Sequence, residues 1–213
     1  MTGSDPFLRP DEQELLQEIM NIAFGQAAAD LAQMVDMFVV LSIPQVCLID
    51  ASELPVFLAS TVEVEGRISM VEQEFWGQFK GSGYLVLPSA SARELVAVLG
   101  NTDLEGNSGL PLKDLEMETL LEVGNILIGA CVGKVAQLLE DTVTYCPPRV
   151  AQEFVKGEAL PLNMWEPGTT AIVLKTLFRF SGRNVSGFLF LVTSQDSLEW
   201  LRKALASFLG RYA

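Results

Sequence analysis

Two short stretches of the chain carry the same polar residues at the same spacing. Glu18 is followed three residues later by Asn21, and Glu122 is followed three residues later by Asn125. On a helix, residues three apart lie on one face, so each stretch presents a carboxylate beside a carboxamide. Glu18 with Asn21 is called the first pair below, and Glu122 with Asn125 the second pair.

These side-chain types permit a narrow range of chemistry. A carboxylate pairs with a lysine or an arginine of another protein, and a carboxamide orients water because it both donates and accepts hydrogen bonds. Neither pair has a nucleophile beside a base, and one carboxylate with one amide is a weak ligand set for a hard cation. We expect the pairs to reach into another protein's active site. There they would place water for attack on a phosphoryl group, which depends mainly on orientation and electrostatics. Glu18, Asn21, Glu122 and Asn125 are therefore the candidate catalytic residues, and no metal or cofactor site is expected on this chain.

Each pair is part of a longer repeat with a constant offset of 104 residues, the difference between positions 18 and 122. The same offset relates Glu14 to Glu118, Gly25 to Gly129, Pro44 to Pro148, Val46 to Val150, Ile68 to Ile172, and Gly83–Leu87 to Gly187–Leu191. A register without gaps over this length indicates an internal duplication. Repeated core positions need only remain apolar, whereas repeated polar residues on an outer face need another reason, and function is one.

The two pairs require long helices to present them. Acidic residues favour a helix start near Asp11, and that helix is expected to run to about Met34, with the second from Leu112 to Leu139. Apolar and β-branched runs predict strands at 38–49 with an interruption at Pro44, at 57–64, 67–76 and 84–87, and then at 143–155, 170–180 and 185–192. Further helices are expected at 88–99 and 195–209.

This order of elements predicts an α+β fold within the broad α/β class. We expect a single domain over 1–213, made of two repeats at about 11–100 and 115–204 that a linker at 100–110 joins. Each repeat alone has few strands, so the repeats are expected to share one sheet. The strand connections are short turns, which makes that sheet largely antiparallel.

Composition excludes several classes of function. The 213 residues include 14 basic and 27 acidic ones, and a net charge of −13 argues against nucleic acid or an anionic membrane as the main partner. The absence of histidine excludes Ser-His-Asp and Cys-His nucleophile systems and histidine-ligated zinc. The three cysteines lack CxxC spacing and are expected to be buried and reduced. No run approaches the length that crosses a bilayer, and we expect a cytoplasmic protein.

The repeated pattern resembles the signature of the CheC/CheX/FliY family of bacterial chemotaxis phosphatases. The matching residues are Glu14-x3-Glu18-x2-Asn21-x22-Pro44 and Glu118-x3-Glu122-x2-Asn125-x22-Pro148. The resemblance extends through both halves of the chain, and two complete motifs make it closest to two-site CheC. One departure is the leading position, which is usually Asp or Ser in the family and is glutamate in both copies here.

The resemblance implies a CheC-like, pseudo-two-fold fold and a phosphatase of the aspartyl-phosphate on a CheY-like response regulator. It implies that Glu18 and Glu122 anchor the regulator through its active-site lysine, and that Asn21 and Asn125 place the attacking water. Magnesium would then belong to the regulator, and this chain would need no cofactor of its own. A CheD-like protein is a further partner that the resemblance suggests. With two motifs in one chain, a monomer is expected.

Two other interpretations remain open from the sequence. The same helices could form a non-catalytic binding module for a response regulator, a CheD-like deamidase or a flagellar switch component. The pairs could also be vestiges in a structural duplicate. Decay of the phosphoryl group on a charged regulator separates these interpretations, because an enzyme accelerates it and a binder does not.

Overall fold

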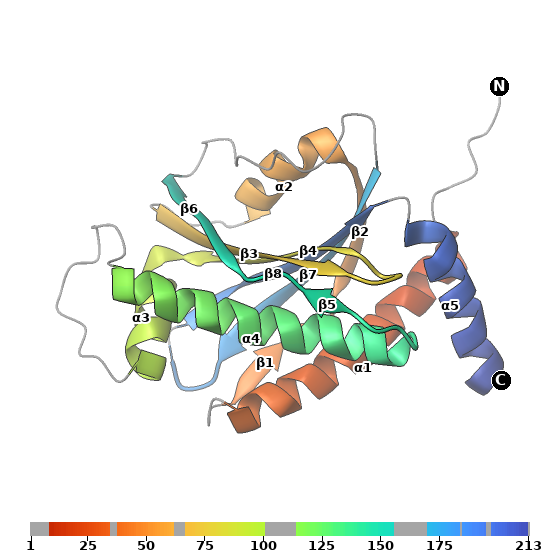
Figure 1. Ribbon diagram of the computed structural model, residues 1–213, viewed down its shortest axis with the longest axis horizontal. Helices are drawn as coiled ribbons and strands as arrows, with labels where there is room; N and C mark the ends of the chain where they lie inside the picture. The colour runs from red at the N-terminus through yellow and green to blue at the C-terminus, as the bar shows by residue number, and fades with distance from the viewer. Residues whose placement is uncertain are drawn as a thin grey trace.

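The computed structural model describes residues 9–34, 38–61, 67–100, 114–155, 170–183, 185–194 and 197–212. Two helices of 25 residues each, α1 (Pro10–Met34) and α4 (Asp114–Leu138), lie along one side of the molecule (Figure 1). Proline fits the first turn of α1 because the N–H that it lacks would have no partner there. Asp11 and Glu12 lie at the positive end of the helix dipole. The two long helices predicted to carry the motif are confirmed.

The remaining elements follow one order in each half of the chain. Before α4 come β1 (Val39–Leu41), β2 (Gln45–Asp50), the short 3-10 helix η1 (Ala51–Glu53), α2 (Leu54–Thr61), β3 (Arg67–Trp76), β4 (Gly81–Pro88) and α3 (Ser89–Gly100). After α4 come β5 (Thr144–Tyr145), β6 (Arg149–Val155), β7 (Thr170–Phe180), β8 (Val185–Ser194) and α5 (Leu198–Tyr212). The predicted α+β class is confirmed.

The described strands form a single antiparallel sheet that both halves of the chain share. Its order is β1-β7-β8-β4-β3-β5, with β2 also paired to β7 and β6 also paired to β3. The early strands β1 and β2 therefore pair with the late strand β7, and the late strands β5 and β6 pair with the early strand β3. Because each half lends strands to the other, neither half completes the sheet alone.

A pseudo-two-fold axis passes through the middle of this arrangement. In the central β4–β8 pairing, Leu85 lies opposite Leu189, and these two residues are themselves related by the offset of 104. The long helices also contact each other at equivalent positions. Asp30 of α1 forms an ion pair of 2.8 Å with Lys134 of α4, which lies 104 residues later. The predicted pseudo-symmetry is confirmed.

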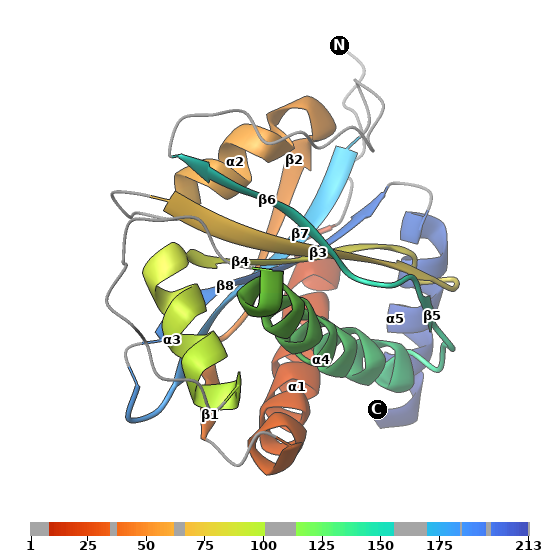
Figure 2. The same cartoon turned by 60° about the vertical axis from the view of Figure 1, so that its left-hand side comes forward.

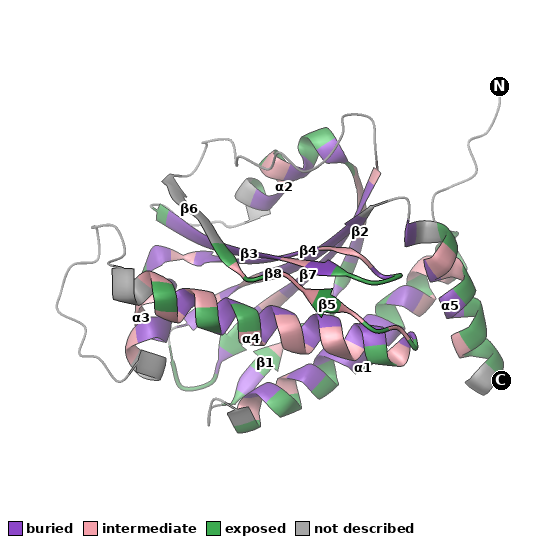
Figure 3. Cartoon of the chain, in the orientation of Figure 1, coloured by how far each residue is buried: buried purple, intermediate pink, exposed green. Residues whose placement is uncertain are grey.

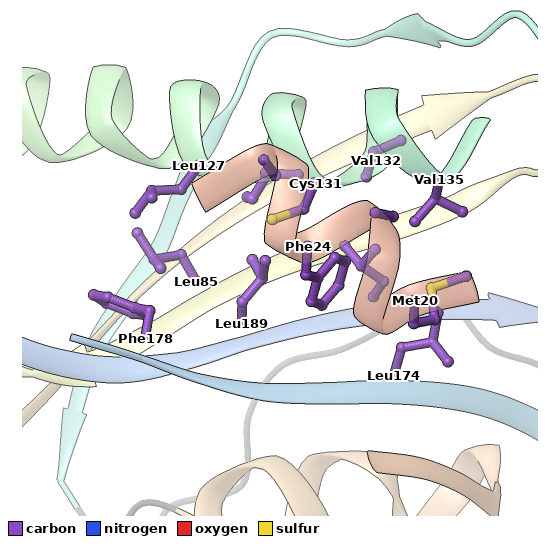
Figure 4. Packing of buried hydrophobic residues seen from close by; sticks show 14 of the residues in the cluster. Met20, Phe24, Leu85, Leu127, Cys131, Val132, Val135, Leu174, Phe178 and Leu189 are labelled. Atoms are coloured by element: carbon purple, nitrogen blue, oxygen red, sulfur yellow. The ribbon is translucent and has the colours of Figure 1, made fainter. Parts of the chain in front are cut away.

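The sheet separates two layers of helix. Both views place α1 and α4 on one face and α2 on the other, with α3 and α5 at opposite ends of the α1–α4 layer (Figures 1 and 2). The larger core lies between the sheet and the α1–α4 layer, where Phe24, Cys131 and Leu189 meet (Figure 4). A smaller core lies under α2, around Leu54, Leu58 and their neighbours. Buried residues of both long helices line their sheet-facing sides (Figure 3).

The predicted strand at 57–64 is wrong over its described part, because these residues belong to α2. The Asp50 side chain caps η1, the turn that leads into α2, by accepting a hydrogen bond of 2.8 Å from the backbone N–H of Ser52. Leu54 and Leu58 are spaced four apart and are both fully buried against the sheet, which is helical periodicity. The apolar composition of the segment predicts a strand, whereas its buried residues have the spacing of a helix.

Residues 62–66 and the predicted linker, apart from Gly100 at the end of α3, lie outside the described residues. The expectation that no run is long enough to cross a bilayer is wrong by length and composition, since Met117–Leu138 of α4 passes that test. About half of that stretch is buried inside the protein, where it packs against α1 and the sheet, as a core helix does.

Candidate active site on the paired helices

Both acid–amide pairs lie on the outer side of their helices. Glu18 and Asn21 are exposed on α1, and Glu122 and Asn125 are exposed on α4. The opposite faces are fixed by burial of apolar neighbours, namely Leu16, Ile19, Met20 and Ala23 on α1 and Leu120, Val123 and Leu127 on α4. Each helix therefore buries one side against the sheet and offers its carboxylate and carboxamide to another molecule.

The two glutamates have no competing partner. Within the described parts of the chain, neither Glu18 nor Glu122 forms a hydrogen bond or an ion pair through its side chain. An exposed, unpaired carboxylate is available to a lysine or arginine of a docking protein. Among the described residues, no group of three or more His, Cys, Asp or Glu could hold a metal ion.

Asn125 of the second pair is held by a buried glutamine. The amide nitrogen Nε2 of Gln73, on β3, donates to Asn125 Oδ1 at 2.6 Å and to the backbone carbonyl of Cys146 at 3.1 Å. Gln73 is only 1% exposed. A backbone carbonyl oxygen only accepts hydrogen bonds, so the Gln73 atom that faces Cys146 must be nitrogen. The same nitrogen faces Asn125, whose contacting atom must then be its oxygen, and the Asn125 NH₂ group is turned away from Gln73.

Asn21 of the first pair has no such support. In the described residues its side chain makes no hydrogen bond. The carbonyl of Ser42, 104 residues before Cys146, is instead satisfied by Thr176 Oγ1 at 2.6 Å. Thr176 takes the place of Gln73 in this half, because β2 pairs Gln45 with Lys175 and β6 pairs Arg149, 104 residues after Gln45, with Glu72. The two sites thus share residues and differ in what stands behind the asparagine.

The close approach of α4 to β3 makes the Gln73–Asn125 contact possible. A Cβ atom added to Gly124, the neighbour of Asn125, would lie 2.5 Å from Cγ1 of Val71. Val71 and Gln73 point to the same side of β3, since side chains alternate along a strand. Glycine at 124 therefore lets the helix backbone come within reach of the Gln73 amide.

The segment around the motif proline is fixed to the same strand. Cys146, two residues before Pro148, donates its backbone N–H to the Glu74 carbonyl at 3.0 Å. Arg149 follows Pro148, and its guanidinium binds Glu72 at 3.0 Å and Glu74 at 2.9 Å. The hydrogen bond and charge of Glu72, together with the charge of Glu74, raise the pKa of Arg149. These contacts hold the Cys146 carbonyl where Gln73 meets it, which connects the proline of the motif to its asparagine.

Sequence reasoning named the four pair residues and missed Gln73. A signal was present, because Gln73 lies between Val71 and Phe75 on the core-facing side of a predicted strand. A polar residue at an apolar position of a strand is informative.

Comparison with known proteins gives three informative matches. CheY-P phosphatase CheC of Bacillus subtilis (strain 168) is 24% identical over 210 residues, which cover 94% of this chain and 96% of that protein. The crystal structure of FliY from Thermotoga maritima matches with a TM-score of 0.73 and 19% identity, over 94% of this chain and 98% of that one. A chain in a FliG–FliM complex from H. pylori matches with a TM-score of 0.60 and 10% identity, over 90% of this chain and 100% of that one.

The chain is similar to the CheC/CheX/FliY family. This confirms the resemblance expected from the repeated motif. The structural matches extend over nearly all of each chain, so they establish the CheC-like fold for both halves. No protein-family model matches the sequence. The functional assignment therefore depends on the CheC relative and on the site itself.

Proposed function

We propose that this protein hydrolyses the aspartyl-phosphate of a CheY-like response regulator. The observation that carries the proposal is the presence of two exposed acid–amide pairs on paired helices, one of them with an oriented amide. The relative named as a CheY-P phosphatase spans almost the same length, which supports the same class of substrate here.

In this proposal the glutamates bind the regulator and the asparagines position the attacking water. Glu18 or Glu122 forms an ion pair with the regulator's active-site lysine, which places the helix over the phosphoryl group. Asn21 or Asn125 then holds a water molecule in line with the P–O bond that breaks. The water attacks phosphorus and the P–O bond to the aspartate breaks. Inorganic phosphate leaves with the protons of the water, and the regulator's aspartate carboxylate is restored. Magnesium on the regulator neutralises the developing charge, and this chain contributes orientation.

The surroundings of the site fit this division of labour. An acidic chain with exposed, unpaired glutamates complements a basic or metal-bearing patch on the partner. We further propose that the protein acts in the cytoplasm as a monomer without a cofactor of its own, and that a CheD-like protein is a second partner.

The second candidate function is a binding module without turnover. Exposed carboxylates would bind a cationic partner whether or not water is activated, and the same fold occurs in a FliG–FliM complex. Decay of a phosphorylated regulator, charged with acetyl phosphate in the presence of magnesium, separates the two. The phosphatase proposal requires faster decay at substoichiometric amounts of this protein. A binding module leaves the rate unchanged or slows it.

A further inference from the structure

We infer that Gln73 is a positioning residue for the second pair, which orients the Asn125 amide and makes the two sites unequal. The inference rests on the proposed function and extends it to a residue outside the repeated motif. The structural basis is the chain of contacts from the Cys146 carbonyl through Gln73 Nε2 to Asn125 Oδ1.

The orientation is determined by groups that have no freedom of their own. Cys146 is held by backbone pairing to Glu74, and its carbonyl accepts hydrogen bonds only. Gln73 is buried and cannot turn its amide without placing two oxygens against each other. Asn125 must then present its NH₂ group outward and keep one oxygen lone pair free. The outward group donates to a phosphoryl oxygen or to water, and the remaining lone pair accepts a hydrogen bond from the attacking water.

Stability alone does not explain a glutamine at this position. Gln73 Oε1 is buried and has no hydrogen-bond partner among the described residues. Leaving a buried polar atom unpaired costs free energy. Pairing of the Cys146 carbonyl does not require that cost, because the hydroxyl of Thr176 pairs the corresponding Ser42 carbonyl in the other half of the chain. The neighbouring core positions Val71 and Phe75 are apolar. A residue that is unfavourable for the core but bonded to a site residue has a role in the site.

The first pair provides an internal comparison. Thr176 satisfies the Ser42 carbonyl, and among the described residues its hydroxyl forms no hydrogen bond with Asn21. Asn21 must therefore be ordered by the docked regulator, at a cost in conformational freedom that Asn125 has already met within the fold. We expect the second pair to have the higher turnover number, and the difference to depend on Gln73.

The decisive test measures kcat and KM for the Gln73→Met substitution in two variant backgrounds. In the Asn21→Ala chain, which retains the second pair, Gln73→Met should lower kcat by about tenfold to a hundredfold with little change in KM, because docking through Glu122 is unaffected. In the Asn125→Ala chain, which retains the first pair, Gln73→Met should have no further effect. A loss of fold or stability would lower both activities equally. Equal losses in both backgrounds, or no loss in the first, would overturn the inference.

A second measurement does not depend on activity or on any variant folding. The side-chain ¹⁵NH₂ group of Asn125 should be ordered on the ps–ns timescale in the unmodified protein, and that of Asn21 should be mobile. If the unmodified protein fails to dephosphorylate regulators, the proposed function falls, and this comparison still decides the role of Gln73. Equal mobility of the two amides would overturn the inference.

Discussion

Met20 and Gly124 occupy the same position in the two long helices, 104 residues apart, and they differ strongly in side-chain size. Met20 is fully buried, whereas Gly124 has no side chain and brings its helix against Val71. The exchange of a large side chain for none moves one helix closer to its strand. It explains how an otherwise repeated site acquires a hydrogen-bonded asparagine in one copy only.

This close approach predicts opposite effects for two glycine substitutions in α4. Gly129→Ala should stabilise the protein by about 0.5–1 kcal/mol, because alanine favours the helix and the added Cβ meets no atom within 4 Å. Gly124→Ala should destabilise it by about 1–3 kcal/mol through overpacking against Val71. Urea denaturation of the two variants measures both changes. Equal effects would contradict the packing described here.

A second prediction concerns Glu12, which connects α1 to Arg202 of α5 and makes the free energy of unfolding depend on pH. Partial burial raises the pKa of Glu12, but hydrogen bonds from the Arg9 backbone and guanidinium and the charge of Arg202 outweigh it, so the pKa lies below its ordinary value. A lowered folded-state pKa contributes stability that is complete above the unfolded-state value of about 4.3 and is lost as pH falls through the folded-state value. Unfolding free energies measured from pH 6 downward should therefore decline below about pH 4.3, and less steeply in Glu12→Gln. Identical pH profiles for the two proteins would exclude this contribution.

The cysteines should differ in reactivity. Cys131 is fully buried between α4, α1 and the sheet (Figure 4), and burial raises the pKa of its thiol. Since the thiolate is the reactive form, Cys131 should resist iodoacetamide at pH 8 in the native protein and react once the chain is unfolded in urea. Burial also raises the pKa of the partly buried Cys47, and the charge of Lys175 opposes that rise. Peptide mapping by mass spectrometry distinguishes the sites, and rapid native labelling of Cys131 would show that this core opens.

Anchoring by the glutamates predicts a change in affinity. Glu18→Lys with Glu122→Lys should weaken binding to a phosphorylated regulator by about tenfold or more, equivalent to ~1.4 kcal/mol per tenfold, because attraction to a lysine becomes repulsion. Glu53→Lys with Glu199→Lys is the control for net charge, since it changes the net charge equally at exposed positions of η1 and α5, where Glu199 pairs with Lys203 of the same helix. Titration calorimetry compares the affinities of the two double variants for the regulator. Equal weakening by both variants would reduce the effect to net charge.

The sequence predicted those features that repeat or have a clear period. The two long helices, the antiparallel strands and the exposure of Glu18, Asn21, Glu122 and Asn125 follow from the offset of 104 and from helical spacing. The α2 helix was missed, because an apolar segment of eight residues has no strong period of its own and its conformation depends on packing of Leu54 and Leu58 under the sheet.

The support behind Asn125 could not be predicted for a different reason. Gln73 and Asn125 are 52 residues apart, and their contact depends on the register of β3 against β6 and on the approach of α4. The spacing of residues along the chain indicates neither that register nor that approach. A repeat identifies what the two halves share, and the structure was needed to show where they differ.

The central claim is that the two asparagines place the attacking water. The most direct measurement is the rate of phosphoryl loss from an acetyl-phosphate-charged regulator with the Asn21→Ala, Asn125→Ala double variant. The matched control is Gln33→Ala with Gln137→Ala, two exposed amides that are also 104 residues apart on α1 and α4. The account predicts a loss of about 10²–10³ in rate for the asparagine variant with regulator binding retained, and an unchanged rate for the control. Full activity in the asparagine variant would contradict the account.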